Sequence, residues 1–223
     1  MVDGAAGGGV PVLHSYFRSS TSVRLRVALH LKGIAYEYRA YPLREGAQRS
    51  PAYLAINPQG LVPSLTLAGG STLTQSLAII EYLDETVPEP PLLPADAVGR
   101  ARVRSLALAI ACEIHPLNNL KVLDHLRTAC GFDQRQVVEW FRHWVATTFE
   151  PLEIRLAREP ETGTFCHGDR PGLADICLFA QVLNNRRFDV DMSPYPTIAR
   201  IHAGCAGLPA FEAAMPERQP DAE

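Results

Sequence analysis

A proline-rich stretch near the middle of the chain constrains its fold most strongly. The sequence VPEPPLLPAD, residues 87–96, holds four prolines among ten residues. Proline fixes one backbone torsion and removes an amide donor, so such a stretch is stiff and forms little regular structure. Strand and helix signals alternate before it, whereas only helix signals follow it. We therefore interpret residues 88–95 as a linker between two domains.

The first domain, residues 12–87, has an α/β pattern. Pro11–Phe17 is apolar with β character, and a helix is predicted from about Ser22 to Lys32, with Gly33 after its end. Tyr36–Pro42 alternates aromatic and polar residues, which predicts a second strand.

The remainder of this domain predicts a hairpin and a helix. The stretch SPAYLAINP is a short helical segment that ends at Pro58. Two antiparallel strands then meet at Gly69-Gly70, a dipeptide suited to tight turns. A helix over Ser76–Thr86 follows and ends before Pro88. The element order is therefore βαβ, short helix, ββα.

The second domain, residues 96–223, is predicted to be all-helical. One long helix spans about Asp96–Thr128 with an interruption at Pro116, and PYPTIARIHAGCAGLPAFEAAMP supplies two short helices near the end. The other two predicted helices run from the capping residue Asp133 to about Glu159, and over Leu173–Arg187.

Composition excludes several classes of function. The chain has 223 residues, 47% apolar, and a net charge of −3, so no basic field indicates a nucleic-acid partner. No apolar run is long enough for a membrane span. The five cysteines form no C-x-x-C pair, which argues against a disulfide framework or a metal site and indicates a reducing cytoplasm. Residues 1–11 predict a flexible tail without signal-peptide order.

A cluster of hydroxyl residues precedes the first predicted helix. Capping is one explanation, because serine and threonine side chains accept hydrogen bonds from first-turn amides. Anion binding is the other, because a helix N-terminus combines free N–H groups with a positive dipole end. The sequence alone leaves both open, and Arg24 and Arg26 are interpreted as surface or salt-bridging residues. The hydroxyl residues are Ser19, Ser20, Thr21 and Ser22, directly after Arg18.

Two further features belong to the same domain. Val62-Pro63 opens a strand, and a cis bond there would expose the Val62 backbone, although trans is the usual state. Gln75-Ser76 begins a second helix, where Ser76 is either a cap or a donor to a carboxylate.

The chain resembles the zeta class of glutathione transferases, the maleylacetoacetate and maleylpyruvate isomerases. The resemblance covers nearly the whole chain, and its specific parts are SSTSVRLRVAL, NPQGLVPSL, QSLAIIEYL, LLPAD, IHPLNNLKVL, GLADICL and RRFDVDMSPYPTI. It implies a thioredoxin-like domain followed by an all-helical glutathione transferase C-terminal domain that carries the substrate pocket. It also implies a cis Val62-Pro63 bond and a cytoplasmic homodimer.

Two departures from the class pattern bear on the chemistry. Many members have cysteine where this chain has Thr21, which puts a protein nucleophile in doubt but not the use of glutathione's own sulfur. Gly172 stands where the fold usually has a capping serine or threonine. Asp175 is interpreted as a buried structural cap rather than a catalytic acid.

The resemblance implies a glutathione site, assigned position by position. Ser19, Ser20 and Thr21 face the sulfur, and any of the three is a candidate for the contact with the thiolate. The residues implied for the rest of glutathione are Gln48 for its glycyl end, Val62 and Pro63 for its cysteinyl part, Gln75 and Ser76 for its γ-glutamyl end, and His115, Asn119, Leu120 and Lys121 from the helical domain.

The implied activity is isomerisation of a maleyl keto acid, a small dicarboxylate formed in aromatic-compound degradation. Arg18 and Arg187 match positions that hold its carboxylates, with Arg186 as the alternative to Arg187. The sequence does not decide between maleylacetoacetate and maleylpyruvate. A general conjugating transferase and a non-catalytic binding module are the other two interpretations.

Overall fold

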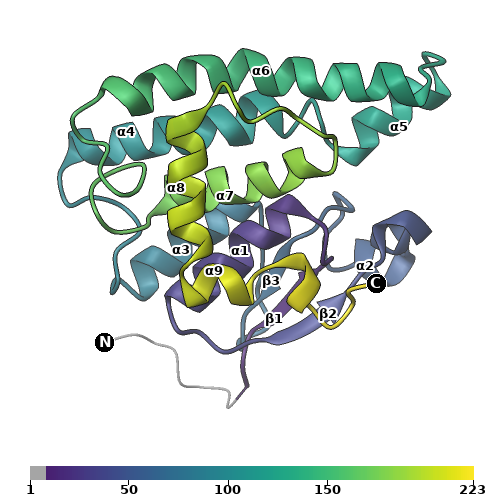
Figure 1. The fold of residues 1–223 in the computed structure, drawn as a ribbon. Helices are drawn as coiled ribbons and strands as arrows, with labels where there is room; N and C mark the ends of the chain where they lie inside the picture. The colour runs from purple at the N-terminus through teal and green to yellow at the C-terminus, as the bar shows by residue number, and fades with distance from the viewer. Residues whose placement is uncertain (1–8) are drawn as a thin grey trace. The chain divides into compact units, whose positions relative to one another are not determined.

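The computed structural model describes residues 9–223 and divides the chain into two compact units (Figure 1). The second unit is Leu92–Gly207, and the described part of the first comprises residues 9–91 together with Leu208–Glu223. Of the expected flexible tail, residues 1–8 lie outside the described part, and residues 9–11 have no regular structure. Residues 208–223, which were expected in the helical domain, thus group with the first unit.

The first unit contains a mixed four-stranded sheet. The strand order is β2-β1-β3-β4, in which β1 pairs in parallel with β2 and antiparallel with β3. Val12 lies opposite both Glu37 and Thr66 in this register. This is the expected thioredoxin-like arrangement. The strands are β1 Val12–Ser15, β2 Glu37–Ala40, β3 Ser64–Thr66 and β4 Thr72–Thr74.

Helix α1 lies at the centre of this unit and contacts both α3 and α9. Leu25 and Leu29 lie one turn apart on α1 and are fully buried, as are Leu13 on β1 and Ile79 on α3. Burying each such side chain contributes about 1.5–3 kcal/mol. The helical elements are α1 Ser20–Leu31, α2 Pro51–Leu54, α3 Ser76–Thr86 and α9 Pro209–Ala213, with 3₁₀ turns at Leu43–Glu45, Ala47–Arg49 and Pro216–Arg218.

The second unit consists of helices only among its described residues. Helix α7 is buried along most of its length and packs against α4 and α8. The helix predicted over 96–128 is interrupted at Pro116 as expected: the backbone becomes π-helical at Ala109–Ile114, forms a turn around Pro116, and resumes as a helix at Leu120. The helices are α4 Ala97–Leu108, α5 Leu120–Thr128, α6 Gln134–Arg158, α7 Leu173–Arg186 and α8 Pro196–Ala206.

The start of α7 is held by Asp175, which is 1% exposed. Its two carboxylate oxygens accept hydrogen bonds from the amides of Cys166 at 2.8 Å and Gly172 at 2.9 Å. The interpretation of Asp175 as a buried cap is therefore confirmed. A Cβ atom on Gly172 would lie 2.7 Å from the carbonyl oxygen of Leu92, which explains why glycine stands at this position.

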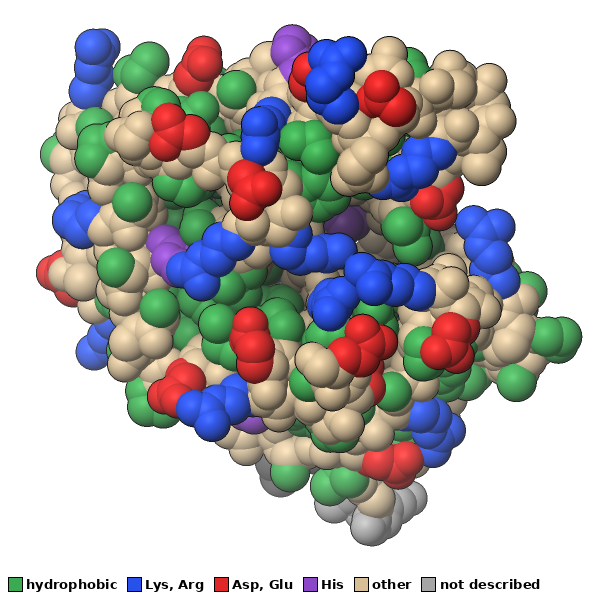
Figure 2. All heavy atoms as spheres, turned by 45° about the vertical axis from the view of Figure 1, so that its right-hand side comes forward, with side chains coloured by type: hydrophobic (Ala, Val, Ile, Leu, Met, Phe, Trp, Pro, Cys, Tyr) green, Lys and Arg blue, Asp and Glu red, His purple; other side chains and the backbone are tan. Residues whose placement is uncertain are grey.

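On the face shown in Figure 2, acidic, basic and apolar side chains are all exposed. Within residues 9–223, no helix combines the length and the apolar character needed to cross a membrane.

A buried histidine on α8 makes the stability of the second unit depend on pH. His202 is 6% exposed, and its ring stacks on that of Phe179 at a centroid distance of 5.1 Å. Its Nε2 atom is buried without a hydrogen-bond partner among the described residues. Burial, together with the positive charge of Arg186, lowers the pKa of His202 from 6.5 to about 4. The folded protein therefore keeps this ring neutral.

We expect the free energy of unfolding to fall between pH 6.5 and pH 4. The unfolded state takes up a proton on His202 in this window and the folded state does not, which costs about 3 kcal/mol by pH 4. Urea denaturation at stepped pH values measures the fall. His202→Gln should reduce its steepness, whereas the same change at the exposed His125 should not. An unchanged slope in His202→Gln would contradict this assignment.

Candidate active site

The turn between β1 and α1 organises the hydroxyl cluster into a chain of hydrogen bonds. Ser19 caps α1, and its Oγ atom accepts from the amide of Ser22 at 3.3 Å. Thr21 Oγ1 donates to the carbonyl oxygen of Val62 at 3.0 Å and lies 2.9 Å from Ser19 Oγ. Because Thr21 gives its one hydroxyl proton to Val62, Ser19 is the donor to Thr21. The cluster therefore caps the helix and also links it to the loop at Val62.

The N-terminus of α1 also has backbone amides that are available to bind an anion. Among the described residues, the amides of Ser20 and Thr21 have no hydrogen-bond partner. These two N–H groups lie in the first turn of α1, where the helix dipole is positive. The geometry can therefore bind a small anion such as a thiolate.

Buried polar side chains hold the loop that carries Val62. The Val62-Pro63 peptide bond is cis, as the resemblance implied. The Tyr53 hydroxyl donates to the carbonyl oxygen of Leu61 at 2.6 Å, and Asn57 Nδ2 donates to the same oxygen at 2.8 Å. Both side chains also contact Ser64 Oγ. Sequence reasoning missed Tyr53 and Asn57, because their burial beneath the loop has no local signal.

Helix α3 begins at the predicted Gln75-Ser76 pair with an unusual backbone. Gln75, not Ser76, is the N-cap, so the interpretation of Ser76 as a cap was wrong. Gln75 has a φ of 68°, in the left-handed region that non-glycine residues seldom adopt and that costs about 1–3 kcal/mol. Its Nε2 atom donates to Gln59 Oε1 at 3.1 Å. Such strain is found most often at functional sites.

Gln48 presents an unsatisfied acceptor. It lies in the 3₁₀ turn Ala47–Arg49 and is 8% exposed. Its Oε1 atom is buried and accepts no hydrogen bond from the part of the chain that the structure describes. Leaving a buried amide oxygen unpaired costs about 1–3 kcal/mol. A ligand that brings an N–H group to this position would remove that cost.

Four further predicted residues lie at the start of α5 in the second unit. Asn119 is the N-cap, and its side chain accepts from the amide of Lys121 at 3.1 Å. Its Nδ2 atom lies 3.4 Å from Nε2 of His115. Leu120 is 39% exposed, and Lys121 is exposed as well. The Asn119 side chain therefore links His115 to the backbone of Lys121 at this helix end.

The two candidate arginines of the second unit end α7. Arg187 is the C-cap, and its guanidinium donates to Asn184 Oδ1 at 3.3 Å and lies 6.0 Å from the centre of the Phe188 ring. Arg186, the last helical residue, acts electrostatically on His202. Both side chains are exposed. Arg186 and Arg187 therefore lie in different surroundings, although they are adjacent in the sequence.

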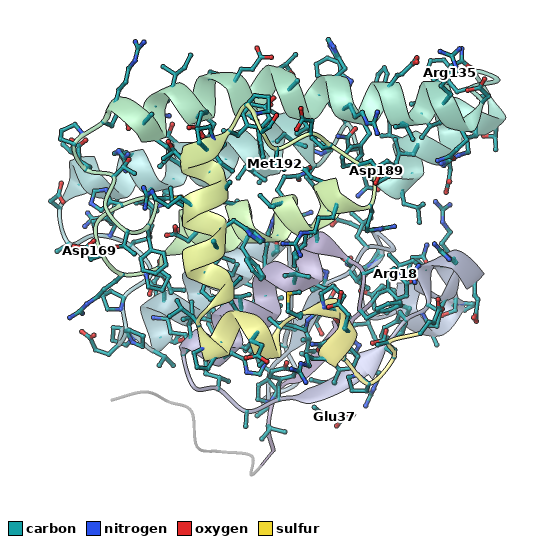
Figure 3. All side chains as sticks on the ribbon, in the orientation of Figure 1. Arg18, Glu37, Arg135, Asp169, Asp189 and Met192 are labelled. Atoms are coloured by element: carbon teal, nitrogen blue, oxygen red, sulfur yellow. The ribbon has the colours of Figure 1, made fainter. Side chains whose placement is uncertain are left out.

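Arg18 lies directly before the capping residue of α1 (Figure 3). Its guanidinium carbon lies 4.8 Å from the centre of the Phe17 ring, and its side chain is 28% exposed. The Nη2 atom is 3.5 Å from a carboxylate oxygen of Glu223, whose side chain is 64% exposed. An exposed pair of this kind contributes about 0–1 kcal/mol, so another carboxylate can replace Glu223.

The two other arginines of the turn are buried, and neither forms a salt bridge among the described residues, so their interpretation as surface or salt-bridging residues was wrong. Arg24 is 1% exposed and Arg26 is fully buried. Arg26 donates to the carbonyl oxygens of Phe17 and Ala214 at 3.0 Å each. Its guanidinium is therefore hydrogen-bonded to the backbone of the first unit and not to solvent.

Comparison with known proteins shows which family the chain belongs to. Residues 18–86 match the family model of the glutathione S-transferase N-terminal domain. Maleylpyruvate isomerase of a Ralstonia species is 47% identical over 94% of this chain and 98% of its own length. A holo structure of maleylpyruvate isomerase, described as a bacterial zeta-class glutathione S-transferase, has a TM-score of 0.93 at 47% identity and covers 95% of this chain and 100% of that one.

A third relative was solved with ligands. The maleylacetoacetate isomerase of Anaeromyxobacter dehalogenans, with dicarboxyethyl glutathione and citrate in its active site, has a TM-score of 0.85 at 44% identity and covers 96% of this chain and 98% of that one. These likenesses extend over both units and include the segments that carry the candidate residues. The chain therefore belongs to the zeta class of the glutathione transferase family.

Proposed function

We propose that this protein is a glutathione-dependent cis-trans isomerase of a maleyl keto acid, which converts maleylpyruvate or maleylacetoacetate into its fumaryl counterpart. The observation that carries the proposal is the β1–α1 turn. It combines two free amides and the hydroxyls of Ser19 and Thr21 with an adjacent arginine, Arg18. A site for a thiolate beside a site for a carboxylate is what this reaction requires.

The residues of the first unit fit the parts of glutathione. The unpaired oxygen of Gln48 suits the glycyl amide, and the backbone of Val62, turned by Pro63, suits the cysteinyl part. Gln75 and Ser76, at the N-terminus of α3, suit the γ-glutamyl carboxylate. From the second unit, we assign the approach to the ligand to His115, Asn119, Leu120 and Lys121, the group at the start of α5.

When bound, glutathione supplies a thiolate whose reversible addition to the alkene makes the central bond single and free to rotate. The protein favours the ionised sulfur, whose free pKa is about 8.5, through the helix dipole, the amides of Ser20 and Thr21, and a redirected hydroxyl proton from Ser19 or Thr21. The Anaeromyxobacter enzyme holds dicarboxyethyl glutathione in its active site, a glutathione derivative with an added dicarboxylate group, which supports this chemistry. No thiol of the protein is needed at residue 21.

Two guanidinium groups orient the substrate. We assign Arg18 to one carboxylate and Arg187 to the other, because planar guanidinium groups bind carboxylates by paired hydrogen bonds. Holding the substrate in one orientation supplies the proximity that the addition requires. A general conjugating transferase would have no need of two carboxylate-binding arginines.

The first test is turnover of maleylpyruvate and maleylacetoacetate with and without glutathione. We expect isomerisation only with glutathione, and no net consumption of it, because the thiolate is released at the end of each cycle. Absorbance of the enol forms reports the rate, and thiol titration reports the glutathione remaining. Faster turnover of an aromatic halide than of either maleyl keto acid would favour the conjugating transferase. No glutathione affinity at all would favour the binding module.

The second test separates activation of the sulfur from substrate binding. Ser19→Ala or Thr21→Ala should raise the pKa of bound glutathione and slow turnover about 10- to 100-fold, the effect of one lost hydrogen bond to a charged group. Arg187→Ala should leave the thiolate pKa unchanged and raise KM for the dicarboxylate. Thiolate absorbance and kinetics on the same variants measure both. If both hydroxyl variants keep the wild-type pKa and rate, the amides and the helix dipole suffice, and the hydroxyls only cap.

We propose that the enzyme is a cytoplasmic homodimer, by analogy with the fold of its class. Light scattering at micromolar concentration should give twice the chain mass of 24.4 kDa. A monomer mass under these conditions would contradict the proposal.

A further inference from the structure

The segment 208–223 contacts the turn that carries Arg18. Gln219, which is 8% exposed, folds this segment by donating to the carbonyl oxygens of Ala213 at 2.9 Å and Met215 at 2.8 Å. Two residues later, the half-buried Asp221 reaches the backbone of Phe17. Figure 3 shows Arg18 beside the end of this segment.

Asp221 bridges two parts of the first unit. One carboxylate oxygen accepts from the amide of Phe17 at 3.1 Å, and the other accepts from the Tyr38 hydroxyl on β2 at 2.6 Å. Burial, and then the hydrogen bond to Asp221, raise the pKa of Tyr38 well above 10, so Tyr38 remains a neutral donor. Both oxygens of the carboxylate are thereby engaged.

The carbonyl group of Phe17 is fixed from the same segment. Its oxygen accepts from Nη2 of the buried Arg26 at 3.0 Å, and Arg26 is bonded in turn to the carbonyl oxygen of Ala214. Both backbone polar groups of Phe17 are therefore held by side chains that belong to, or are anchored on, residues 208–223. The peptide unit that leads into Arg18 has little freedom to rotate.

We propose that Asp221 is a positioning residue for the isomerisation: by fixing the Phe17 amide, it holds Arg18 where it receives a substrate carboxylate beside the Ser19 cap. This inference rests on the proposed function of Arg18.

The distribution of charge supports a positioning role. Asp221 forms hydrogen bonds with the Phe17 amide and Tyr38, and its charge acts on the buried Arg26, whereas no described contact joins it to the Arg18 guanidinium. Arg18 is instead paired with the exposed Glu223 at 3.5 Å, a contact of small free energy. The segment thus holds the backbone before Arg18 firmly while leaving its guanidinium available to an incoming anion.

The test compares variants of Asp221 in the full-length protein. Asp221→Ala should raise KM for the maleyl keto acid about tenfold, because one charge-assisted bond to the turn is lost, and should change kcat and the glutathione Kd less than twofold. Asp221→Asn retains an oxygen for the Phe17 amide and should restore KM. Glu217→Ala, an exposed carboxylate of the same segment, is the matched control and should behave as wild type.

A double-mutant cycle distinguishes positioning from general stability. If Asp221 acts through Arg18, Asp221→Ala should raise KM no further in an Arg18→Ala background. Additive effects, or a parallel loss of kcat, glutathione affinity and melting temperature, would overturn the proposal. If Asp221→Ala does not fold, Asp221→Glu, which displaces the carboxylate by one methylene, replaces it with the same expected rise in KM.

A binding measurement separates this inference from the proposed function. Calorimetric titration of the glutathione-saturated protein with malonate measures the affinity of the Arg18 site for a carboxylate without turnover. If the wild type has no isomerase activity, the proposed function is wrong. The positioning role would still be supported if Asp221→Ala binds malonate about tenfold more weakly than the wild type does. Equal affinity in the two proteins, or none in the wild type, would overturn the role of Asp221.

Discussion

The hydrogen bonds made by the buried guanidinium of Arg26 are the interactions on which the first unit depends. Taking such a charge out of water costs several kcal/mol, and only a full set of hydrogen bonds offsets that cost. Arg26 has this set in Ser15 Oγ and in the carbonyl oxygens of Tyr16, Phe17 and Ala214. Burial lowers its pKa from 12.5, yet arginine stays protonated. One residue thereby joins the end of β1, helix α1 and the segment 208–223.

This connection explains how a surface turn can be rigid enough for catalysis. Turns are usually the mobile parts of a fold, and catalytic groups on them need support from buried neighbours. Arg26 supplies that support from inside the unit, and Asp221 supplies it from the segment 208–223. On the other side of the turn, Thr21 bonds to Val62, whose loop is held by Tyr53 and Asn57. The N-terminus of α1 is therefore fixed from three directions.

Local patterns in the sequence predicted the elements well where the signals are short-range. Helix α3 spans Ser76–Thr86 as expected, and Gly33, at φ 64°, follows α1. The errors arose where a partner lies far along the chain. Arg26 reads as a surface cation because its acceptor at Ala214 is 188 residues away, and nothing near Asp221 indicates a contact with Phe17.

In the candidate site, too, some features were visible in the sequence and others only in the structure. The hydroxyls of the turn and the glutamine-serine pair were visible as helix-start signals, but their hydrogen bonds were not. The sequence leaves open whether Ser19 and Thr21 cap or activate; in the structure they form one chain that ends at Val62. The left-handed backbone of Gln75 also has no sequence signature, because glycine or asparagine is the usual residue there.

Threonine at residue 21 has a consequence for the site as a whole. A cysteine thiol is a weak hydrogen-bond donor, whereas the Thr21 hydroxyl donates to the Val62 carbonyl at 3.0 Å. The residue that departs from the common pattern of the class thus ties the turn proposed to face the sulfur to the loop proposed to bind the cysteinyl part. These two parts of the proposed glutathione site are therefore held together by a hydrogen bond within the protein. A loss of nucleophilic character at residue 21 is accompanied by a gain in preorganisation, which suits a reaction in which the attacking sulfur comes from the cofactor.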